Sequence, residues 1–545
     1  MKDWLFFISL PVILLGSQTI AQAALIEPAS PSPQQGSPAT PAIADIEAEP
    51  VVLRFTINRF VLEGATLLSK AEVNAAVAPY VGKDKDFSDV QHALEAVEKL
   101  YAKRGYSAVH VLLPEQELER GTVRFRAVES RFAKVTVKDN RYFSEASVLN
   151  ALPSIRTGGV PRSKQIAKEL KLANENPARQ LNVVLKAGSR DEEIDANVVV
   201  TDSKPTSWGT QFDNSGSIET GTTRLGFSYR NANAFDADHV ASLQYLTSPQ
   251  HTDRARVIGG SYKVPLYEDG ASVEFFGGYS NINALVGGLS NFQGGGLLFS
   301  TRYNTSLERI GTFNPRLSFG LDWRKFKRLQ MENTPPTVLY NDIVVTPLSL
   351  TYAATGKFAK SDIDANVSYS INVPKMSKGK TADFEVYDQV NRTSPTPSYK
   401  VLRYAFSHLK LVGDAWQFRL AVSGQWSRDM LIEGEKIRLG GANAVRGFSE
   451  GSEGGRTGVR MNLESYTPDF GRGDLRSRAV IFYDAGKARR FDGISTIAGA
   501  GFGLRLSYTE QFSLRVDRAQ IKKEGTDPMQ TAGNWRWHAS LNATF

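Results

Sequence analysis

The stretch LGGANAVRGFSEGSEGGRTG, residues 439 to 458, contains the side chains whose types and spacing could do chemistry. Residues 447 to 451 spell G-x-S-x-G, the pattern of a hydrolase nucleophile elbow, with Ser449 as the nucleophile. The same stretch carries Arg446, whose guanidinium can fork onto a carboxylate with two charge-assisted hydrogen bonds. An elbow needs a strand, a strained turn and then a helix, whereas the glycine-rich segment after Ser449 cannot begin a helix. We therefore expect no catalytic residue and no enzyme activity.

Composition excludes several other classes of function. The formal charge of +8 is spread along the chain rather than gathered into a basic stripe, so nucleic acid is not an expected partner. The absence of cysteine excludes disulfides and thiolate metal sites, and the six histidines show no ligand spacing. Gly379-Lys380-Thr381 lacks the earlier glycine of a phosphate-binding loop, because Pro374 stands in its place. We expect neither a metal nor a cofactor.

The first fifty residues have the composition of an export signal followed by a tether. Lys2 precedes an apolar run from Trp4 to Leu15, and Ala21-Gln22-Ala23 offers a cleavage site. We assign residues 1–23 to a signal peptide, because the run is too short to cross roughly 30 Å of hydrocarbon. Residues 24–50 are rich in proline, alanine and serine and are expected to form a linker.

Two small α+β modules are expected next, over residues 51–129 and 130–204. The first should contain a strand over 53–64, helices over 69–77 and 89–104, and strands over 106–113 and 122–129. The second should repeat that order, with a strand over 131–139, helices over 144–152 and 163–173, and strands over 181–188 and 195–202. Two such modules in series indicate binding units rather than a catalytic cleft.

From residue 205 to residue 545 the pattern changes to strands of about ten residues in which apolar and polar side chains alternate. In residues 317–324 the apolar face holds Leu317, Phe319, Leu321 and Trp323, and the other face holds Ser318, Gly320, Asp322 and Arg324. A soluble sandwich also alternates. Here, however, the apolar faces carry aromatic residues near their ends and the opposite faces carry many charges, which suits a lipid-facing wall around a wet lumen. We predict a transmembrane β-barrel.

The number of candidate strands is about sixteen, an even number that a barrel with both ends in the periplasm requires. That parity places the connection over residues 428–458 on the extracellular side. The final segment, WRWHASLNATF, alternates without error and ends on Phe545. An aromatic residue closing the last strand is typical of the assembly signal of outer-membrane barrels.

Together these features resemble a known family. A signal peptide, two modules similar to POTRA domains, a 16-stranded antiparallel barrel and a Val-Arg-Gly-Phe motif in the long sixth outer loop are similar to the outer-membrane transporters of two-partner secretion. These TpsB-type transporters, the ShlB/FhaC/HecB-like family, belong to the Omp85 superfamily. The sharpest motifs are Val445, Arg446, Gly447 and Phe448 in the loop, and Phe482, Asp484 and Gly486 in the strand VIFYDAGKA.

The resemblance implies that loop 6 folds back into the barrel, where its arginine pairs with the aspartate of the strand motif. The alternation agrees, because Ile481 and Tyr483 lie on the apolar face and Asp484 must then point inward. Lysine could not reproduce the forked pair of Arg446 with Asp484. Phe448 would wedge between wall side chains, and Gly486 would leave room for the loop tip. A static strut and a moving gate both fit this arrangement.

The resemblance also implies a function in protein transport, as in type V secretion. An unfolded TpsA-type exoprotein, a haemolysin or adhesin, would dock on the periplasmic POTRA domains, thread the barrel without ATP and fold outside the cell. The expected surroundings are outer-membrane lipids, with the barrel assembly machinery acting during biogenesis. Within the same superfamily, an outer-membrane assembly factor is the alternative. From another class, the motif at Ser449 leaves an outer-membrane lipid hydrolase as a weaker one.

Client capture by the second module is expected to use a free sheet edge. An exposed edge strand can bind an extended chain by adding it to the sheet, through backbone hydrogen bonds that need little sequence complementarity. The candidate strands are residues 181–188 and 195–202.

Overall fold

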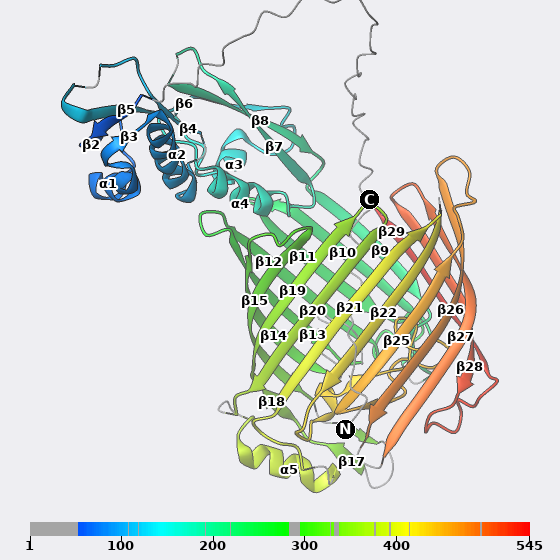
Figure 1. Ribbon diagram of the computed structural model, residues 1–545. Coiled ribbons are helices and arrows are strands. Elements are labelled where there is room, and N and C mark those ends of the chain that lie inside the picture. The colour runs from blue at the N-terminus through cyan, green and yellow to red at the C-terminus, as the bar shows by residue number, and fades with distance from the viewer. Residues whose placement is uncertain are drawn as a thin grey trace, which may run out of the picture.

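A computed structural model describes residues 53–545, except for residues 107, 118, 191, 219, 283–294, 328, 332–336, 375–377, 392–393, 414 and 491–492. The expected signal peptide and linker lie outside the described residues. Two small modules, each containing helices and strands, precede a closed barrel, and they lie at one end of it (Figure 1). None of the described helices is both long and apolar enough to cross a bilayer.

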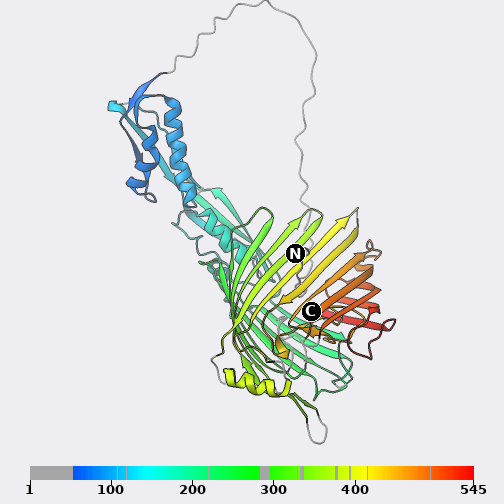
Figure 2. The ribbon, with the colours of Figure 1, turned by 60° about the horizontal axis from the view of Figure 1, so that its bottom comes forward.

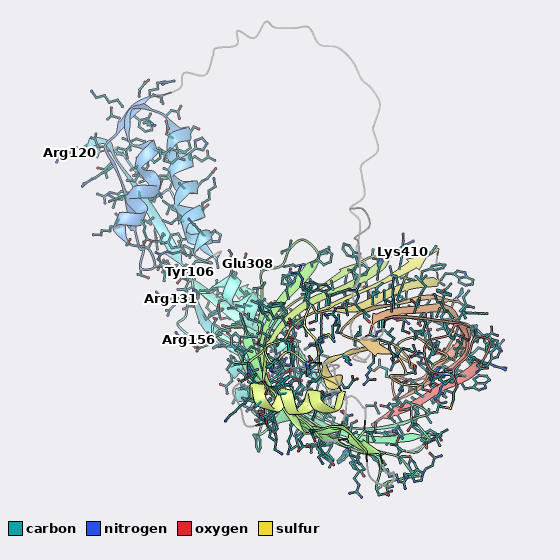
Figure 3. All side chains as sticks on the ribbon, turned by 90° about the horizontal axis from the view of Figure 1, so that it is seen from below. Tyr106, Arg120, Arg131, Arg156, Glu308 and Lys410 are labelled. Carbon is teal, nitrogen blue, oxygen red and sulfur yellow. The ribbon has the colours of Figure 1, made fainter. Side chains whose placement is uncertain are left out.

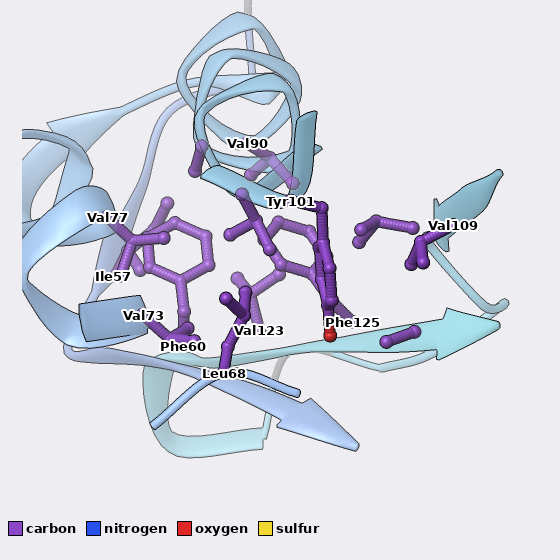
Figure 4. Packing of buried hydrophobic residues seen from close by; sticks show 14 residues of the cluster. Ile57, Phe60, Leu68, Val73, Val77, Val90, Tyr101, Val109, Val123 and Phe125 are labelled. Atoms are coloured by element: carbon purple, nitrogen blue, oxygen red, sulfur yellow. The ribbon is translucent and has the colours of Figure 1, made fainter. Parts of the chain in front are cut away.

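The first module packs two helices on a three-stranded sheet. Its elements are β1 (Phe55–Ile57), β2 (Arg59–Glu63), α1 (Lys70–Val77), β3 (Gly82–Lys85), α2 (Phe87–Lys103), β4 (Val109–Leu112) and β5 (Thr122–Glu129). The sheet order is β2-β5-β4, with β2 parallel to β5. Figure 4 shows its core, in which Val90 and Tyr101 of α2 lie over Phe60 and Phe125 of the sheet. Capping boxes at Ser69 and Asp86 begin the two helices.

The prediction of one strand over residues 53–64 is wrong in one respect. Asn58 divides this run, because its backbone N–H donates to Gly121 O at 2.7 Å and its side-chain amide donates to Arg120 O at 2.9 Å. The chain therefore changes partner, so that β1 pairs with β3 and β2 joins the main sheet. The sequence reading missed β3, whose residues GKDK have no apolar alternation.

The second module repeats the β-α-α-β-β order. Its elements are β6 (Arg131–Lys138), α3 (Glu145–Asn150), α4 (Ser163–Ala173), β7 (Arg179–Ala187) and β8 (Glu193–Asp202). The sheet order is β6-β8-β7. Residues 195–202, one of the two segments expected to offer a free edge, lie in the central strand β8, which pairs with β6 on one side and β7 on the other. That expectation is wrong for β8, and only β7 of the two candidates is an edge strand.

The rest of the chain closes into an antiparallel barrel of sixteen strands, with β18 and β19 counted as one strand interrupted at Thr346. The strands are β9 (Thr206–Asp213), β10 (Arg224–Ala234), β11 (His239–Thr247), β12 (Arg256–Leu266), β13 (Ala271–Ser280), β14 (Gly296–Ser306), β15 (Phe313–Phe326), β18 (Ile343–Val345), β19 (Pro347–Phe358), β20 (Ser361–Asn372), β21 (Lys400–Val412), β22 (Trp416–Trp426), β25 (Thr457–Tyr466), β26 (Leu475–Arg489), β27 (Ile494–Tyr508), β28 (Phe512–Lys523) and β29 (Trp535–Thr544). Figure 2 shows the ring of strands from an oblique direction.

The barrel closes where β29 pairs with β9. At this seam Phe545 N donates to Trp208 O and Trp208 N donates to Phe545 O, both at 2.8 Å. The helix α5 (Thr381–Asn391) lies in the connection between β20 and β21, at the end of the barrel opposite the two modules (Figure 1).

The two faces of the barrel wall have opposite character. Large apolar side chains point outward, with Ile481 66% exposed, Leu321 54% exposed and Trp537 51% exposed. Charged residues next to outward-facing ones along the strands, such as Asp322 beside Leu321 and Asp484 beside Tyr483, are buried inside. A continuous exposed apolar band around a polar interior is the arrangement of a barrel surrounded by lipid.

The second module docks on the rim of the barrel through a buried ion pair. Arg179, the first residue of β7, donates to Asp238 in the β10–β11 turn at 2.7 Å, and Asn176 donates to Ala232 O at 2.7 Å. Tyr267 also donates to Asp238. Burial raises the pKa of Asp238 to about 6 and lowers that of Arg179, so desolvation offsets part of their attraction. The pair therefore orients the module more than it strengthens the fold.

Candidate functional site

The candidate site is the connection between β22 and β25, which enters the barrel from the end where α5 lies and occupies its interior. The 3-10 turn Glu433–Glu435 is followed by the short paired strands β23 (Ile437–Arg438) and β24 (Gly454–Gly455). Figure 3 views the barrel from this end, with the connection inside the ring of strands. We call residues 427–456 loop 6.

Arg446 lies at the tip of loop 6 and is 1% exposed. Its Nε donates to Asp484 Oδ2 at 2.6 Å and its Nη2 donates to Asp484 Oδ1 at 2.8 Å, while its backbone N–H donates to Asp484 Oδ2 at 3.1 Å. The forked pair implied by the family resemblance is thus present, with Asp484 on β26. The planar guanidinium matches the carboxylate in a way that the lysine ammonium cannot.

Two further carboxylates meet the same guanidinium. Glu464 on β25 lies 2.9 Å from Arg446 Nη2, and Asp517 on β28 lies 3.4 Å from Arg446 Nη1. The sequence reading missed both residues, whose signal is only that each is an acidic residue on the inward face of its strand. Arg419 pairs with Glu464, and Arg505 and Arg515 pair with Asp517, so the buried charges of both signs are partnered.

Apolar contacts support the ion cluster. Val445 and Phe448 are buried in one cluster with Leu439, Ala488, Ile497 and Ile521, so the tip is also packed against β26, β27 and β28. The ring of Phe482 lies under the guanidinium, with its centroid 3.4 Å from Cζ of Arg446. A cation over an aromatic face is attracted by the ring quadrupole, and this attraction is larger where water is excluded.

Glycines allow the loop tip to approach the wall. Gly447 has φ +100°, which side chains rarely adopt, and its N–H donates to Nε2 of His538 at 3.0 Å. A methyl group at Gly486 would lie 3.1 Å from Val445 Cγ2, so Gly486 lies directly under the tip. Gly499 on β27 pairs with Asp484 on β26. A methyl group at Gly499 would overlap the carbonyl oxygen of Arg446, and the sequence alone did not indicate this close approach.

Replacement of Gly499 by alanine is expected to push the tip of loop 6 away from the wall, because the added methyl group meets backbone rather than a flexible side chain. The cost of overpacking a buried site is about 1–3 kcal/mol. With the transport function that the family resemblance implies, we expect secretion to fall several-fold. The assay compares secreted exoprotein at equal barrel levels in the outer membrane. The control is Gly226→Ala on β10, where the added methyl group makes only ordinary contacts, the nearest at 3.5 Å. Equal secretion by both variants would contradict the prediction.

The G-x-S-x-G motif does not form a nucleophile elbow. Ser449 Oγ accepts a hydrogen bond from Arg536 Nη1 at 3.1 Å, and the described residues from Ser449 to β24 contain no helix. His538 Nε2 accepts from the backbone N–H of Gly447, and no hydrogen bond joins His538 to Ser449 among the described residues. Among the described residues no group of three or more acidic residues and histidines is placed to hold a metal ion. The geometry gives the lipid-hydrolase alternative no support.

Comparison with known proteins identifies the family. The model for the haemolysin secretion/activation proteins ShlB/FhaC/HecB matches residues 192–506. The chain belongs to this family. The model for the ShlB-type POTRA domain matches residues 55–130, which cover the first module. As a member of the ShlB/FhaC/HecB family, the protein is located in the outer membrane and translocates a partner exoprotein across it.

Relatives share the architecture at low identity. The heme/hemopexin transporter protein HuxB of Haemophilus influenzae strain 86-028NP is 23% identical over 487 residues, which cover 86% of this chain and 82% of HuxB. The outer membrane transporter CdiB of Dickeya dadantii is 24% identical over 427 residues, or 75% of this chain and 72% of CdiB. The solved structure of CdiB from Escherichia coli superposes with a TM-score of 0.69 at 20% identity, covering 92% of this chain and 93% of CdiB.

Proposed function

We propose that this protein exports one TpsA-type exoprotein, a haemolysin or an adhesin, and that loop 6 closes the lumen when no client is present. The observation that carries the role of loop 6 is its buried position: Arg446 at the tip is enclosed by carboxylates from β25, β26 and β28. A client chain that passes through the barrel must displace this segment or pass beside it. With Arg446, the tip of loop 6 consists of Val445, Gly447 and Phe448. The part of the barrel wall on which the tip rests consists of Phe482, Asp484 and Gly486.

The free edge of β7 is the proposed entry point for the client. Val184 and Leu185 on this strand are 37% and 41% exposed, and among the described strands only β8 pairs with β7. An unfolded segment can add to this edge through backbone hydrogen bonds. Because β7 begins at Arg179 on the barrel rim, a bound segment would lie at the entrance of the lumen.

A photoactivatable cross-linker placed at Val184 tests this entry point. We expect it to capture the unfolded amino-terminal part of the exoprotein during secretion. The matched control is the same cross-linker at Lys134, an exposed residue of β6 on the opposite edge of the sheet. Capture at Lys134 but not at Val184 would move client binding to the other edge.

Deletion of the gene tests the function itself. Loss of a single surface or secreted protein, with other outer-membrane barrels at normal levels, is the expected result for a dedicated transporter. A general loss of barrels would instead indicate an assembly factor. Restoration of secretion by a plasmid-borne copy provides the control. We further propose that the barrel assembly machinery inserts this chain, with Phe545 as part of its signal, and that lipids surround the exposed apolar band.

A further inference from the structure

Loop 6 has a second buried ionic contact, near its beginning. Glu435, the last residue of the 3-10 turn, is 1% exposed. Its Oε1 accepts from Arg324 Nη1 on β15 at 2.7 Å, and its Oε2 accepts from Arg403 Nη2 on β21 at 2.8 Å. Each carboxylate oxygen therefore has its own guanidinium, and a loop carboxylate is held by two cations of the wall.

The surrounding wall is arranged to hold this carboxylate in place. Gln425 on β22 donates to the backbone carbonyl of Glu435 at 2.8 Å, and its side-chain oxygen accepts from Arg403 Nε, also at 2.8 Å. Arg324 in turn pairs with buried Asp322, which accepts from Ser300 Oγ at 2.7 Å. Such fixed partners make it costly to remove any one member of the set.

The two contacts use different strands of the wall and carry opposite signs. Glu435 is held from β15 and β21, whereas Arg446 is held from β25, β26 and β28. At the tip of loop 6 a cation meets wall carboxylates, whereas at its root an anion meets wall guanidiniums. Among the ion pairs of the described residues, the Glu435 cluster and the Arg446 cluster have no residue in common.

We propose that Glu435 is a second latch of loop 6, which holds the root of the loop against β15 and β21 while Arg446 holds the tip. This inference rests on the proposed role of loop 6 as the segment that closes the lumen. Glu435 is a positioning residue: it keeps the loop across the lumen even after the tip has been released. Opening the lumen fully then requires release of both latches. Because the clusters share no side chain, a substitution in one cluster leaves the ion pairs of the other intact.

Neighbouring Glu433 provides a matched control. It belongs to the same 3-10 turn, but its carboxylate pairs only with Lys436 and Arg438 of loop 6 itself in the described contacts. Glu433→Gln therefore removes the same charge from the same turn without releasing a wall contact.

Single-channel conductance of the purified full-length protein in planar bilayers tests the proposal. We expect Glu435→Gln to raise the fraction of time spent in conducting states at least about tenfold over the native protein, because one member of a buried pair is removed. Glu433→Gln should behave like the native protein. Glu435→Gln combined with Arg446→Ala should conduct more than either single variant. Heat-modifiable electrophoretic mobility checks that each barrel is folded.

If Glu435→Gln does not assemble, Arg403→Gln removes the same contact from the wall side and should reproduce the increase. Equal conductance of the Glu433, Glu435 and Arg403 variants would overturn the second latch. Secretion of the exoprotein is measured separately in cells. If the native protein secretes normally but these three variants have equal conductance, only the second latch is refuted. Failure of the native protein to secrete any exoprotein refutes the proposed function, whatever the conductance.

Discussion

Replacing Arg446 by alanine is expected to reduce secretion of the exoprotein at least about tenfold. The substitution leaves Glu464, Asp484 and Asp517 without their shared cation in a confined site, and breaking a buried pair on one side costs about 3–5 kcal/mol. The tip of loop 6 then loses its ion pairs with the wall carboxylates and the contact of the guanidinium with the Phe482 ring. Secreted exoprotein is measured by immunoblot of the culture medium, normalised to folded barrel in the outer membrane.

Two companion variants sharpen this result. Arg446→Lys should not restore secretion, because an ammonium cannot fork onto Asp484 while also reaching Glu464. Arg438→Ala removes a cation of the same loop whose ion pair and hydrogen bond in the described structure are both with loop residues, and should secrete normally. Unchanged secretion by Arg446→Ala would remove Arg446 from the mechanism.

The same variant distinguishes a strut from a gate. If loop 6 only props the barrel open, Arg446→Ala should lower the amount of folded barrel in the membrane together with secretion. If loop 6 is a gate, the barrel should reach the membrane in normal amount and conduct ions more readily. The clusters at the tip and the root of loop 6 favour the gate, because each consists of side-chain contacts that can be broken without breaking backbone hydrogen bonds between barrel strands.

Replacing Arg179 by alanine is expected to detach the second module from the barrel rim and to reduce secretion nearly as strongly. The change leaves Asp238 buried without a cation and removes the contact of the guanidinium with the Phe143 ring. We expect cleavage by an added protease at residues 203–205, between β8 and β9, to become several-fold faster in purified protein.

The control for the rim contact is Arg190→Ala. Arg190 forms a surface pair with Glu193 and its side chain is 85% exposed, so its loss should change neither cleavage nor secretion. Faster cleavage of Arg179→Ala with normal secretion would show that the rim contact is dispensable for transport. Unchanged cleavage would mean that the other contacts, such as Glu175 with Lys263, are sufficient for docking.

Local periodicity predicted most of the fold. Helix α4 begins and ends at the predicted residues, and the inward and outward faces of β15 and β26 follow the alternation. Periodicity carries no information about pairing order, so it cannot show that β8 is the central strand of its sheet. It also missed β3, because a strand that pairs with only one neighbour and buries little needs no apolar pattern.

The site was predicted only in part, and for a different reason. The pairing of Arg446 with Asp484 came from the family resemblance, whereas Glu464 and Asp517 could not be distinguished from other inward acidic residues. Their convergence on one guanidinium depends on the tilt and stagger of three strands, which a single sequence does not specify. The partners of Glu435 on β15 and β21 depend on the same geometry.

The attachment of the second module to the rim bears on the kinetics of transport. If β7 captures the client as proposed, the bound segment lies beside the pore mouth. Its entry is then an intramolecular event governed by an effective concentration in the millimolar range rather than by the concentration of free client. Weak binding with fast exchange is then sufficient to deliver the client to the pore. Such a site can release one stretch of polypeptide as readily as it binds the next.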